Sequence, residues 1–300
     1  MREAAKMRKA TAGMRAFAVL NYLFLAGVAL TCLLPMVNQL AVSFSSSPAV
    51  SAGRVYLWPV DFTLESYEYM AGKPEFFKAF SVSLRRLLLG VPLSMVVSVL
   101  AAYPLSRQVH EFKARKYYIW YFIVPMMFYG GLIPSYMVVR NTGLIDSALA
   151  LALPCSINVF NIILLMNFFR SIPKEMEEAA AIDGAGHVST LFQIMLPVSA
   201  PVLATVTLFF IVNHWNAWFD GLIYMNSPAN YPLQTYLQTQ VVSQDILSTE
   251  SLRDIRQIAN ISDRTGKAAQ IFLAAIPVLA VYPFLQKHFT SGIVMGSVKG

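Results

Sequence analysis

The chain has 300 residues, of which 56% are hydrophobic and only 13% are charged, and its formal net charge is +7. A soluble domain carries about 25% charged residues, so this composition excludes an ordinary soluble globular protein. The apolar residues also occur in runs of about 20, the length that a helix needs to cross a hydrocarbon core of about 30 Å. The sequence therefore predicts an all-α polytopic membrane protein. We interpret its positive charge as the Lys and Arg that orient such a protein, not as a nucleic-acid surface.

The N-terminal segment 1–15 is basic and precedes the first apolar run. A cleaved signal peptide is an alternative interpretation, because the stretch VSA at 50–52 resembles a cleavage site. The apolar run 16–38 is longer than the apolar region of a signal peptide, which has about 7–15 residues. We therefore predict that this run is retained as the first membrane span.

Six apolar runs have the length and composition of transmembrane helices, and together they form a single transmembrane domain over residues 1–300. The predicted spans are residues 16–38, 82–104, 117–138, 146–169, 199–222 and 269–289. Lys and Arg are more numerous in the segments on the side of the N-terminus, and those in 105–116 carry much of the weight because that segment is short. The positive-inside rule then places both termini in the cytoplasm and the long loops 39–81 and 223–268 outside.

The loop 170–198, which faces the cytoplasm in this topology, is net negative although the whole chain is positive. Pro173 suits the first position of a helix. Glu177 and Glu178 follow where the helix dipole favours negative charge, and Gly184 can adopt the positive φ that ends a helix. Connections between helices usually need about 2–8 residues. We therefore predict a helix-turn-helix between the fourth and fifth spans that docks a cytoplasmic partner, with a simple connection as the alternative.

Residues 178–197 fit the pattern EAA-x3-G-x9-I-x-L-P, which resembles the signature loop of binding-protein-dependent ABC importer permeases. Further stretches are similar to the carbohydrate branch of this family: AAYPLSR at 101–107, NHWNAWFDGLIYMN at 213–226, YPLQTYLQ at 231–238 and QKHF..GIVMGSVKG at 286–300. The likeness covers nearly the whole chain. It extends to permeases for oligosaccharides and polysaccharide fragments, including the second permease subunit of an alginate-type importer. The stretch SLRRLLLG at 83–90 departs from this branch, which leaves the substrate open.

The resemblance implies that the loop is a coupling element seated on a separate ATP-hydrolysing subunit. It assigns this coupling to Glu177, Glu178, Ala179, Ala180, Asp183, Gly184, Ile194, Leu196 and Pro197. The chain has no G-x-x-x-x-G-K-[ST] phosphate loop, so it is not expected to be an enzyme or to hold a cofactor, and ATP and Mg belong to the partner subunits. The implied partners are a second, homologous permease, two ATP-binding subunits, a periplasmic or extracellular solute-binding protein, a carbohydrate substrate and the lipid of a bacterial cytoplasmic membrane.

Polar and aromatic residues inside the fourth and fifth spans are candidates for the translocation path, because polar groups within spans usually face a cavity or another helix. The candidates are Asn158, Asn161, Asn213, Trp215, Asn216 and Trp218. Amides and aromatic rings suit the hydroxyls and ring faces of sugars. Hydrogen bonding between helices, or an interfacial belt for the tryptophans, explains the same residues equally well.

Arg85, Arg86 and Arg140 are predicted at the outer mouth, where positive charge would attract an anionic sugar. Ordinary surface charge is the alternative explanation for these three arginines.

Other classes of protein have weaker support. An ATP-independent secondary carrier usually shows internal repeats and buried ionisable residues, and we find no repeat and no Asp or Glu deep in any span. No catalytic constellation indicates a membrane enzyme. Cys32 and Cys155 lie inside apolar runs, which argues against a disulfide framework, and the histidines lack the spacing of metal ligands. An ABC permease for a non-sugar solute remains open.

Overall fold

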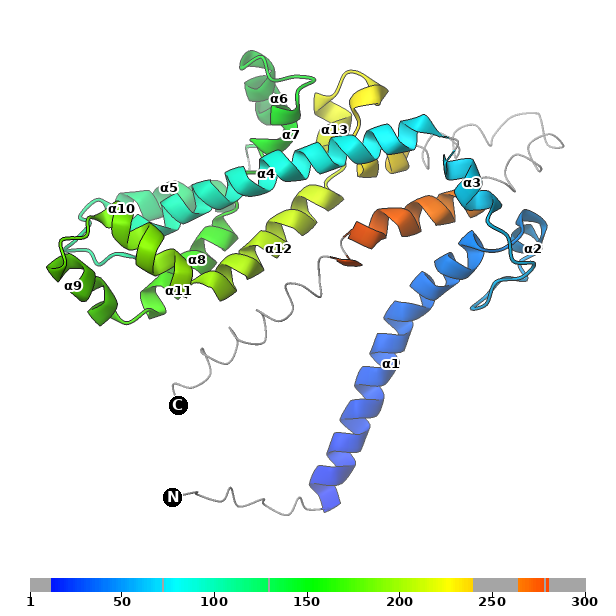
Figure 1. Cartoon of the computed structure of the whole chain (residues 1–300), viewed down its shortest axis with the longest axis horizontal. Coiled ribbons are helices and arrows are strands. Elements are labelled where there is room, and N and C mark those ends of the chain that lie inside the picture. The colour runs from blue at the N-terminus through cyan, green and yellow to red at the C-terminus, as the bar shows by residue number, and fades with distance from the viewer. Residues whose placement is uncertain (1–11, 72, 129, 240–263, 278, 281–300) are drawn as a thin grey trace. The chain divides into compact units, whose positions relative to one another are not determined.

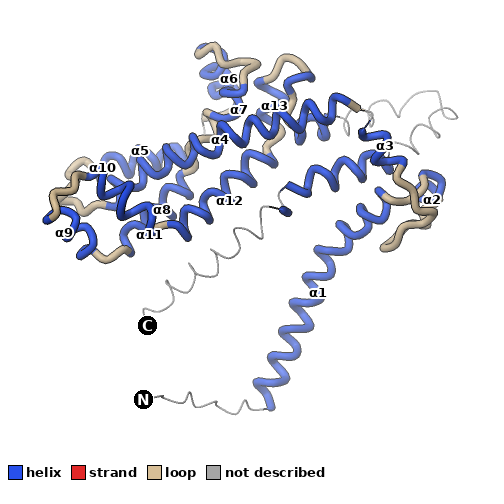
Figure 2. Tube along the Cα trace, viewed as in Figure 1, coloured by secondary structure: helices blue, strands red, loops and turns tan. Residues whose placement is uncertain are grey.

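The computed structural model describes residues 12–71, 73–128, 130–239, 264–277 and 279–280. The chain divides into two compact units, one of residues 1–72 with 251–272 and the other of residues 73–250 with 273–300. The described residues are mostly helical, and their one β-bridge joins Ser45 to Phe62. Figure 2 shows the helices and the loops that connect them. The predicted all-helical class is thus confirmed at this coarse level.

The first unit contains the long apolar helix α1 (Ala12–Ser43), followed by α2 (Ser47–Ser51) and α3 (Glu65–Ala71). Residues 16–43 of α1 include no charged side chain, and large apolar side chains such as Tyr22 are as much as 72% exposed. A helix that is apolar on all sides suits a lipid environment. Its length is sufficient to cross a membrane, in agreement with the first predicted span.

The second unit contains the candidate site (Figure 1). Its helices are α4 (Pro74–Ser106), α5 (Arg115–Met127), α6 (Leu132–Asn141), α7 (Ala148–Ala152), α8 (Val159–Ser171), α9 (Lys174–Ile182), α10 (His187–Ser189), the π-helix η1 (Thr190–Met195), α11 (Leu196–Val198), α12 (Ala200–Asn216), α13 (Phe219–Tyr224) and the 3₁₀ helix η2 (Pro228–Asn230). Helix α4 packs on α8 and α12, and these three helices share one apolar core with η1.

A stripe of small buried residues allows the close packing of α4. Gly90, Ser94, Ser98 and Ala102 recur every fourth residue, which places them on one face of the helix. His214 of α12 lies against this stripe, with its Nε2 atom 3.2 Å from the Ser94 hydroxyl. Apolar side chains gain little from leaving lipid, so small residues that let two helices approach closely are a main source of helix association in membranes.

Several predicted spans are interrupted. The third predicted span, 117–138, is divided between α5 and α6, and the fourth, 146–169, is broken between α7 and α8. Helix α12 ends at Asn216 inside the fifth predicted span, and α13 begins at Phe219. Two of the described helices are long and apolar enough to cross a membrane by themselves. The number of possible spans rises to four if each of two bent helix pairs is counted as one span. The sixth predicted span, 269–289, lies partly outside the described residues.

Candidate coupling site and translocation path

Helix α9 forms the first half of the predicted helix-turn-helix. Pro173 occupies the N-cap, one residue before the expected position, and Lys174 begins the helix. Glu175 and Glu177 lie in the first turn, where the exposed N–H groups of the backbone favour carboxylates. Ala180 is buried, whereas the side chain of Ile182 is 86% exposed. The helix therefore attaches by one narrow face and leaves the rest of its surface open.

Gly184 ends α9 with a left-handed backbone. Its φ is +78°, which a residue with a Cβ adopts at a cost of about 1–2 kcal/mol. The amide of Ala185 donates to the carbonyl of Ala180 at 2.9 Å, and the amide of Gly184 donates to Ala181 at 3.1 Å. These two bonds make a Schellman motif, which satisfies carbonyls that the helix end would otherwise leave without donors.

The chain then continues through α10, η1 and α11 before it turns by 84° into α12. The bend lies at Ser199, which is fully buried. A π-helix is rare and often occurs at functional positions. The segment that returns from the loop to the apolar core therefore contains both an unusual helix and a sharp bend.

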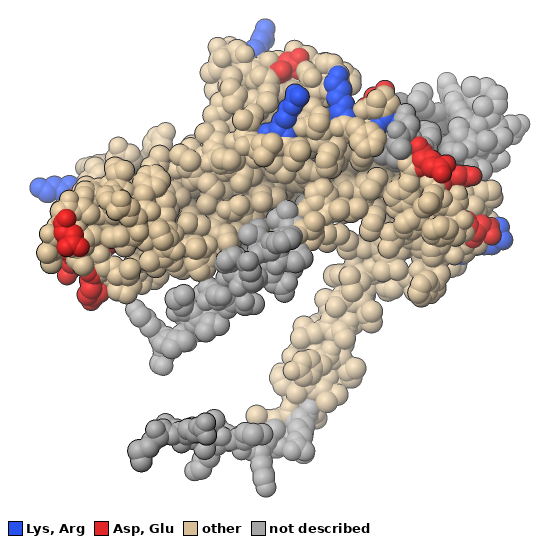
Figure 3. Space-filling model, in the orientation of Figure 1, with Lys and Arg blue, Asp and Glu red and all other residues tan. Residues whose placement is uncertain are grey.

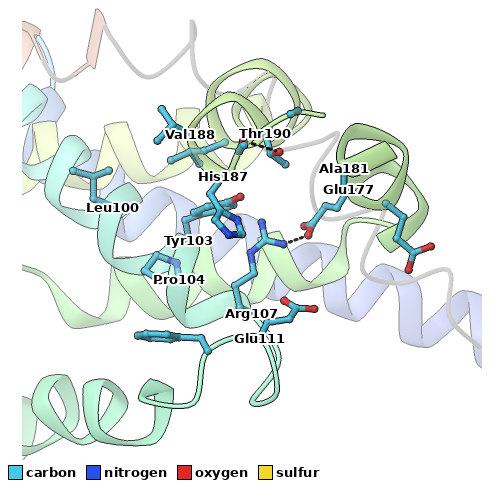
Figure 4. Close-up of a pocket in the computed structure, with 15 residues that line it drawn as sticks. Leu100, Tyr103, Pro104, Arg107, Glu111, Glu177, Ala181, His187, Val188 and Thr190 are labelled. Atoms are coloured by element: carbon cyan, nitrogen blue, oxygen red, sulfur yellow. Dashed lines mark hydrogen bonds and ion pairs between the residues drawn. The ribbon is translucent and has the colours of Figure 1, made fainter. Parts of the chain in front are cut away.

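Arg107, at the end of α4, forms an ion pair with Glu177 of α9 (Figure 4). The exposed fractions of their side chains are 13% for Arg107 and 23% for Glu177. The Arg107 guanidinium carbon also lies 4.3 Å from the centroid of the Tyr103 ring, one helical turn earlier. A cation over an aromatic face is attracted by the ring's quadrupole, so Tyr103 holds the arginine in position to meet Glu177.

These residues line a pocket of about 630 Å³ between the end of α4 and the helix-turn-helix. Its lining is largely apolar and also includes Glu111, Glu177 and Glu178. Figure 3 shows that acidic side chains gather around α9, where Glu175, Glu178 and Asp183 are exposed. The surface around α9 therefore combines apolar and acidic side chains, which suits a partner with basic and apolar side chains.

A second ion pair on α4 joins Arg86 to Asp220 of α13. The side chain of Arg86 is 0% exposed and that of Asp220 is 15% exposed. The Arg86 Nη1 atom donates to Asp220 Oδ1 at 3.0 Å and to the carbonyl of Ala217 at 3.3 Å. The arginine thus binds both the acid and the backbone where α12 ends.

Residues 69–295 match the family of binding-protein-dependent transport system inner membrane components. The chain belongs to this family. It is 39% identical to Protein LplC of Bacillus subtilis (strain 168) over the full length of both chains. It is 40% identical to the polygalacturonan/rhamnogalacturonan transport system permease protein YtcP of the same organism, over 95% of this chain and 99% of the relative.

The chain is also similar to a solved structure, that of a bacterial ABC transporter involved in the import of the acidic polysaccharide alginate. The TM-score is 0.83 and the identity is 31%, with 93% of this chain and 98% of the other chain covered. Sequence and structure therefore agree that this is an ABC transporter permease, and the family resemblance read from residues 178–197 is confirmed.

The residues of this permease that were assigned to coupling fall into two groups. Glu177 and Ala180 face the rest of the unit, the first through Arg107 and the second by burial. The exposed group is Glu178, Ala179, Asp183, Gly184 and Pro197, while Ile194 and Leu196 are half-buried in η1 and α11. Adjacent residues of the motif thus serve different surfaces, and the exposed group is available to a partner.

The candidate path residues are not all alike in the permease. Asn158 is the N-cap of α8, and its side-chain oxygen accepts from the Asn161 amide at 3.2 Å. Asn161 and Trp215 are buried, and Trp215 donates to the carbonyl of Ala274 at 2.9 Å. Asn213, Asn216 and Trp218 are exposed. The exposed residues remain candidates for contact with a solute.

The structure also changes the interpretation of the outer-mouth arginines. Arg85 and Arg140 are exposed, but Arg86 is buried and neutralised by Asp220, so it adds no free positive charge to a mouth. Asp220, two residues before the end of predicted span 199–222, is a partner of Arg86 that sequence reasoning did not assign. The carboxylate in this apolar run was the available signal, because such residues are rare within spans and usually paired.

Sequence reasoning also missed the role of Arg107. The stretch AAYPLSR at 101–107 carried only a family resemblance, although Tyr103 and Arg107 are four residues apart and therefore adjacent on a helix. That spacing was a signal for the contact between the two side chains. The pairing of Arg107 with Glu177 had no local signal, because the two residues are far apart in the chain.

Proposed function

We propose that this chain is one of two permease subunits in an ATP-driven importer of oligosaccharides or polysaccharide fragments. The observation that carries the proposal is the likeness along nearly the whole chain to a polygalacturonan/rhamnogalacturonan permease and to a structure from an alginate importer. Two carbohydrate polymers among these relatives favour the sugar branch over other solutes. The exposed residues Asn213, Asn216 and Trp218 are suited to sugar hydroxyls and ring faces.

In this proposal, the loop 170–198 is the coupling element and faces the cytoplasm, as do both chain termini. Its exposed acidic and apolar surface docks on a separate ATP-hydrolysing subunit, of which the complex contains two. A solute-binding protein delivers the sugar on the other side, and a second, homologous permease completes the path. The support for docking is local: α9 leaves most of its surface open, including Glu178 and Ile182.

Reconstitution tests the function directly. The tagged chain, co-expressed with the genes beside it, is purified and placed in proteoliposomes with the binding protein and ATP. We expect an ATPase subunit to co-purify, and we expect uptake of galacturonan or alginate oligomers that requires ATP. Equal uptake without ATP, or uptake of an amino acid or phosphate in place of any sugar, would contradict the proposal. Neutral maltooligosaccharides in the same assay show whether the substrate must be acidic.

The topology is tested separately by labelling. Cys32 and Cys155 are replaced by Ser, and a single cysteine is introduced at the exposed Asp183 or Asp61. A thiol reagent that cannot cross the membrane should label position 61 in intact cells and position 183 only after the cells are opened. The reverse pattern would place the loop 170–198 outside and overturn its role in docking.

A further inference from the structure

The end of α4 is a point where several helices of the second unit are joined by arginines. Arg115 of α5 donates from Nε to the carbonyl of Leu105 at 2.9 Å, and Arg170 of α8 donates from Nη2 to the same carbonyl at 3.2 Å. Carbonyls at the C-terminus of a helix carry partial negative charge, which favours such cations. Arg107 then extends this junction to α9 through Glu177.

The polar link to α9 matters because this helix has few other attachments. Within Lys174–Ile182, all of which the structure describes, Ala180 is the buried residue. The covalent route from α9 to the core passes either back through Pro173 to α8 or forward through the Gly184 turn to η1. The Arg107–Glu177 ion pair is a third route, and it reaches α4 directly.

Helix α4 is well placed to receive a displacement from α9. It packs on α7, α8 and α12, and its own length is continuous from Pro74 to Ser106. Arg86, about 30 Å along the helix from Arg107 at 1.5 Å per residue, binds the carbonyl of Ala217 and the carboxylate of Asp220 where α12 ends. That break adjoins Asn216 and Trp218, which are candidates for contact with the solute.

We propose that the Arg107–Glu177 ion pair, supported by Tyr103, is the contact that transmits movement of the coupling loop to α4. The proposal rests on the proposed function, because it requires an ATPase that moves the loop. Glu177 and Glu178 then have separate roles: Glu177 faces the permease and transmits the movement, and the exposed Glu178 faces the partner. Arg107 and Glu177 are positioning residues that do not contact the sugar.

The experiment uses the whole complex in proteoliposomes, with ATP hydrolysis and sugar uptake measured on the same preparation. The variants are Arg107→Glu, Glu177→Arg and the double exchange of both charges. Glu111→Gln is the matched control, since it removes a carboxylate that lines the same pocket but is 43% exposed and pairs with His110. The amount of ATPase subunit that co-purifies is measured for every variant.

Each single exchange should lower the sugar transported per ATP by about tenfold, the size of effect that residues along a coupling route produce. Binding of the ATPase subunit should be retained. The double exchange should restore most of the sugar transported per ATP, while Glu111→Gln should resemble wild type.

Normal coupling in both single variants would overturn the proposal, and so would a double exchange no better than the worse single variant. Loss of the ATPase subunit from the single variants would also overturn it, because the pair would then serve docking. A wild-type complex without an ATPase would instead refute the proposed function.

Discussion

The two ends of α4 use the same chemistry in different surroundings. At one end, Arg86 pairs with Asp220 inside the protein, where the arginine has no contact with solvent. At the other end, Arg107 pairs with Glu177 beside an open pocket, and both side chains keep some exposure. The charge in the first case is enclosed by apolar helices, and in the second it lies next to the acidic helix α9.

This difference in burial indicates a difference in role. Breaking a buried pair leaves a charge without compensation in a medium of low dielectric constant, so the pair stays closed while the protein is folded. The Arg107–Glu177 pair keeps 13% and 23% exposure, so it is less enclosed and stabilises the folded chain less than the buried pair does. The Arg86 end is therefore suited to fixing structure, and the Arg107 end to transmitting a movement.

The largest expected effect comes from breaking the buried pair. Asp220→Ala leaves Arg86 enclosed without its acid and should reduce the free energy of unfolding by about 3–5 kcal/mol. The measurement is the thermal unfolding midpoint of the detergent-solubilised protein, together with the yield of monodisperse material. Arg86→Met combined with Asp220→Leu removes both charges and should recover most of the loss. If Asp220→Ala unfolds at the wild-type temperature, the pair does not fix the structure.

A smaller effect is expected in the middle of α4, where the helix meets α12. A Cβ added at Gly90 would lie 2.7 Å from Cε1 of His214, so Gly90→Ala must displace the imidazole or separate the helices. Overpacking of this kind costs about 1–3 kcal/mol, and the thermal midpoint measures it. Gly27→Ala is the matched control, because nothing lies within 4 Å of a Cβ at that position. Equal midpoints for the two variants would contradict the close packing of α4 on α12.

At the exposed end, Gly184→Leu should disturb the turn that ends α9. The site has open space around it, so the expected loss of about 1–2 kcal/mol comes from the left-handed backbone and not from a clash. We expect reduced sugar uptake with little change in the thermal midpoint of the whole protein. Gly184→Asn should be milder, since Asn tolerates this conformation. Gly186→Ala is the control with ordinary φ of −75°, and a defect in it as large as that of Gly184→Leu would argue against the backbone explanation.

The smallest effect is expected at Asn158, where the structure favours a helix cap over a contact with the solute. Asn158→Ala should lower the free energy of unfolding by about 1 kcal/mol, and Asn158→Asp, which keeps the acceptor oxygen, should restore it. Thermal midpoint and apparent KM for uptake are measured together. A raised KM with an unchanged midpoint in Asn158→Ala would return this residue to the translocation path.

Much of the local structure followed from the sequence. Continuous apolar runs allow a helix in lipid and little else, because lipid offers no hydrogen-bonding partner for an unpaired backbone. This accounts for α1 and α4. Pro173 and Gly184 have restricted or special backbone preferences, so the limits of α9 were predicted to within one residue. The break between α7 and α8 was not predicted, although Asn158 is a good N-cap residue, because the surrounding run is uniformly apolar.

Only the tertiary structure decided which of two neighbouring residues of the same charge is paired and which is exposed. Arg85 and Arg86 are chemically identical, as are Glu177 and Glu178, and nothing in a local pattern distinguishes the members of each pair. Adjacent residues on a helix point about 100° apart, since a turn contains 3.6 residues. Packing therefore buries Arg86 and exposes Arg85, and it directs Glu177 towards Arg107 while Glu178 remains at the surface. Composition and turn chemistry determined a helical membrane protein with an acidic loop, whereas the contacts between distant helices determined which of its charges are paired.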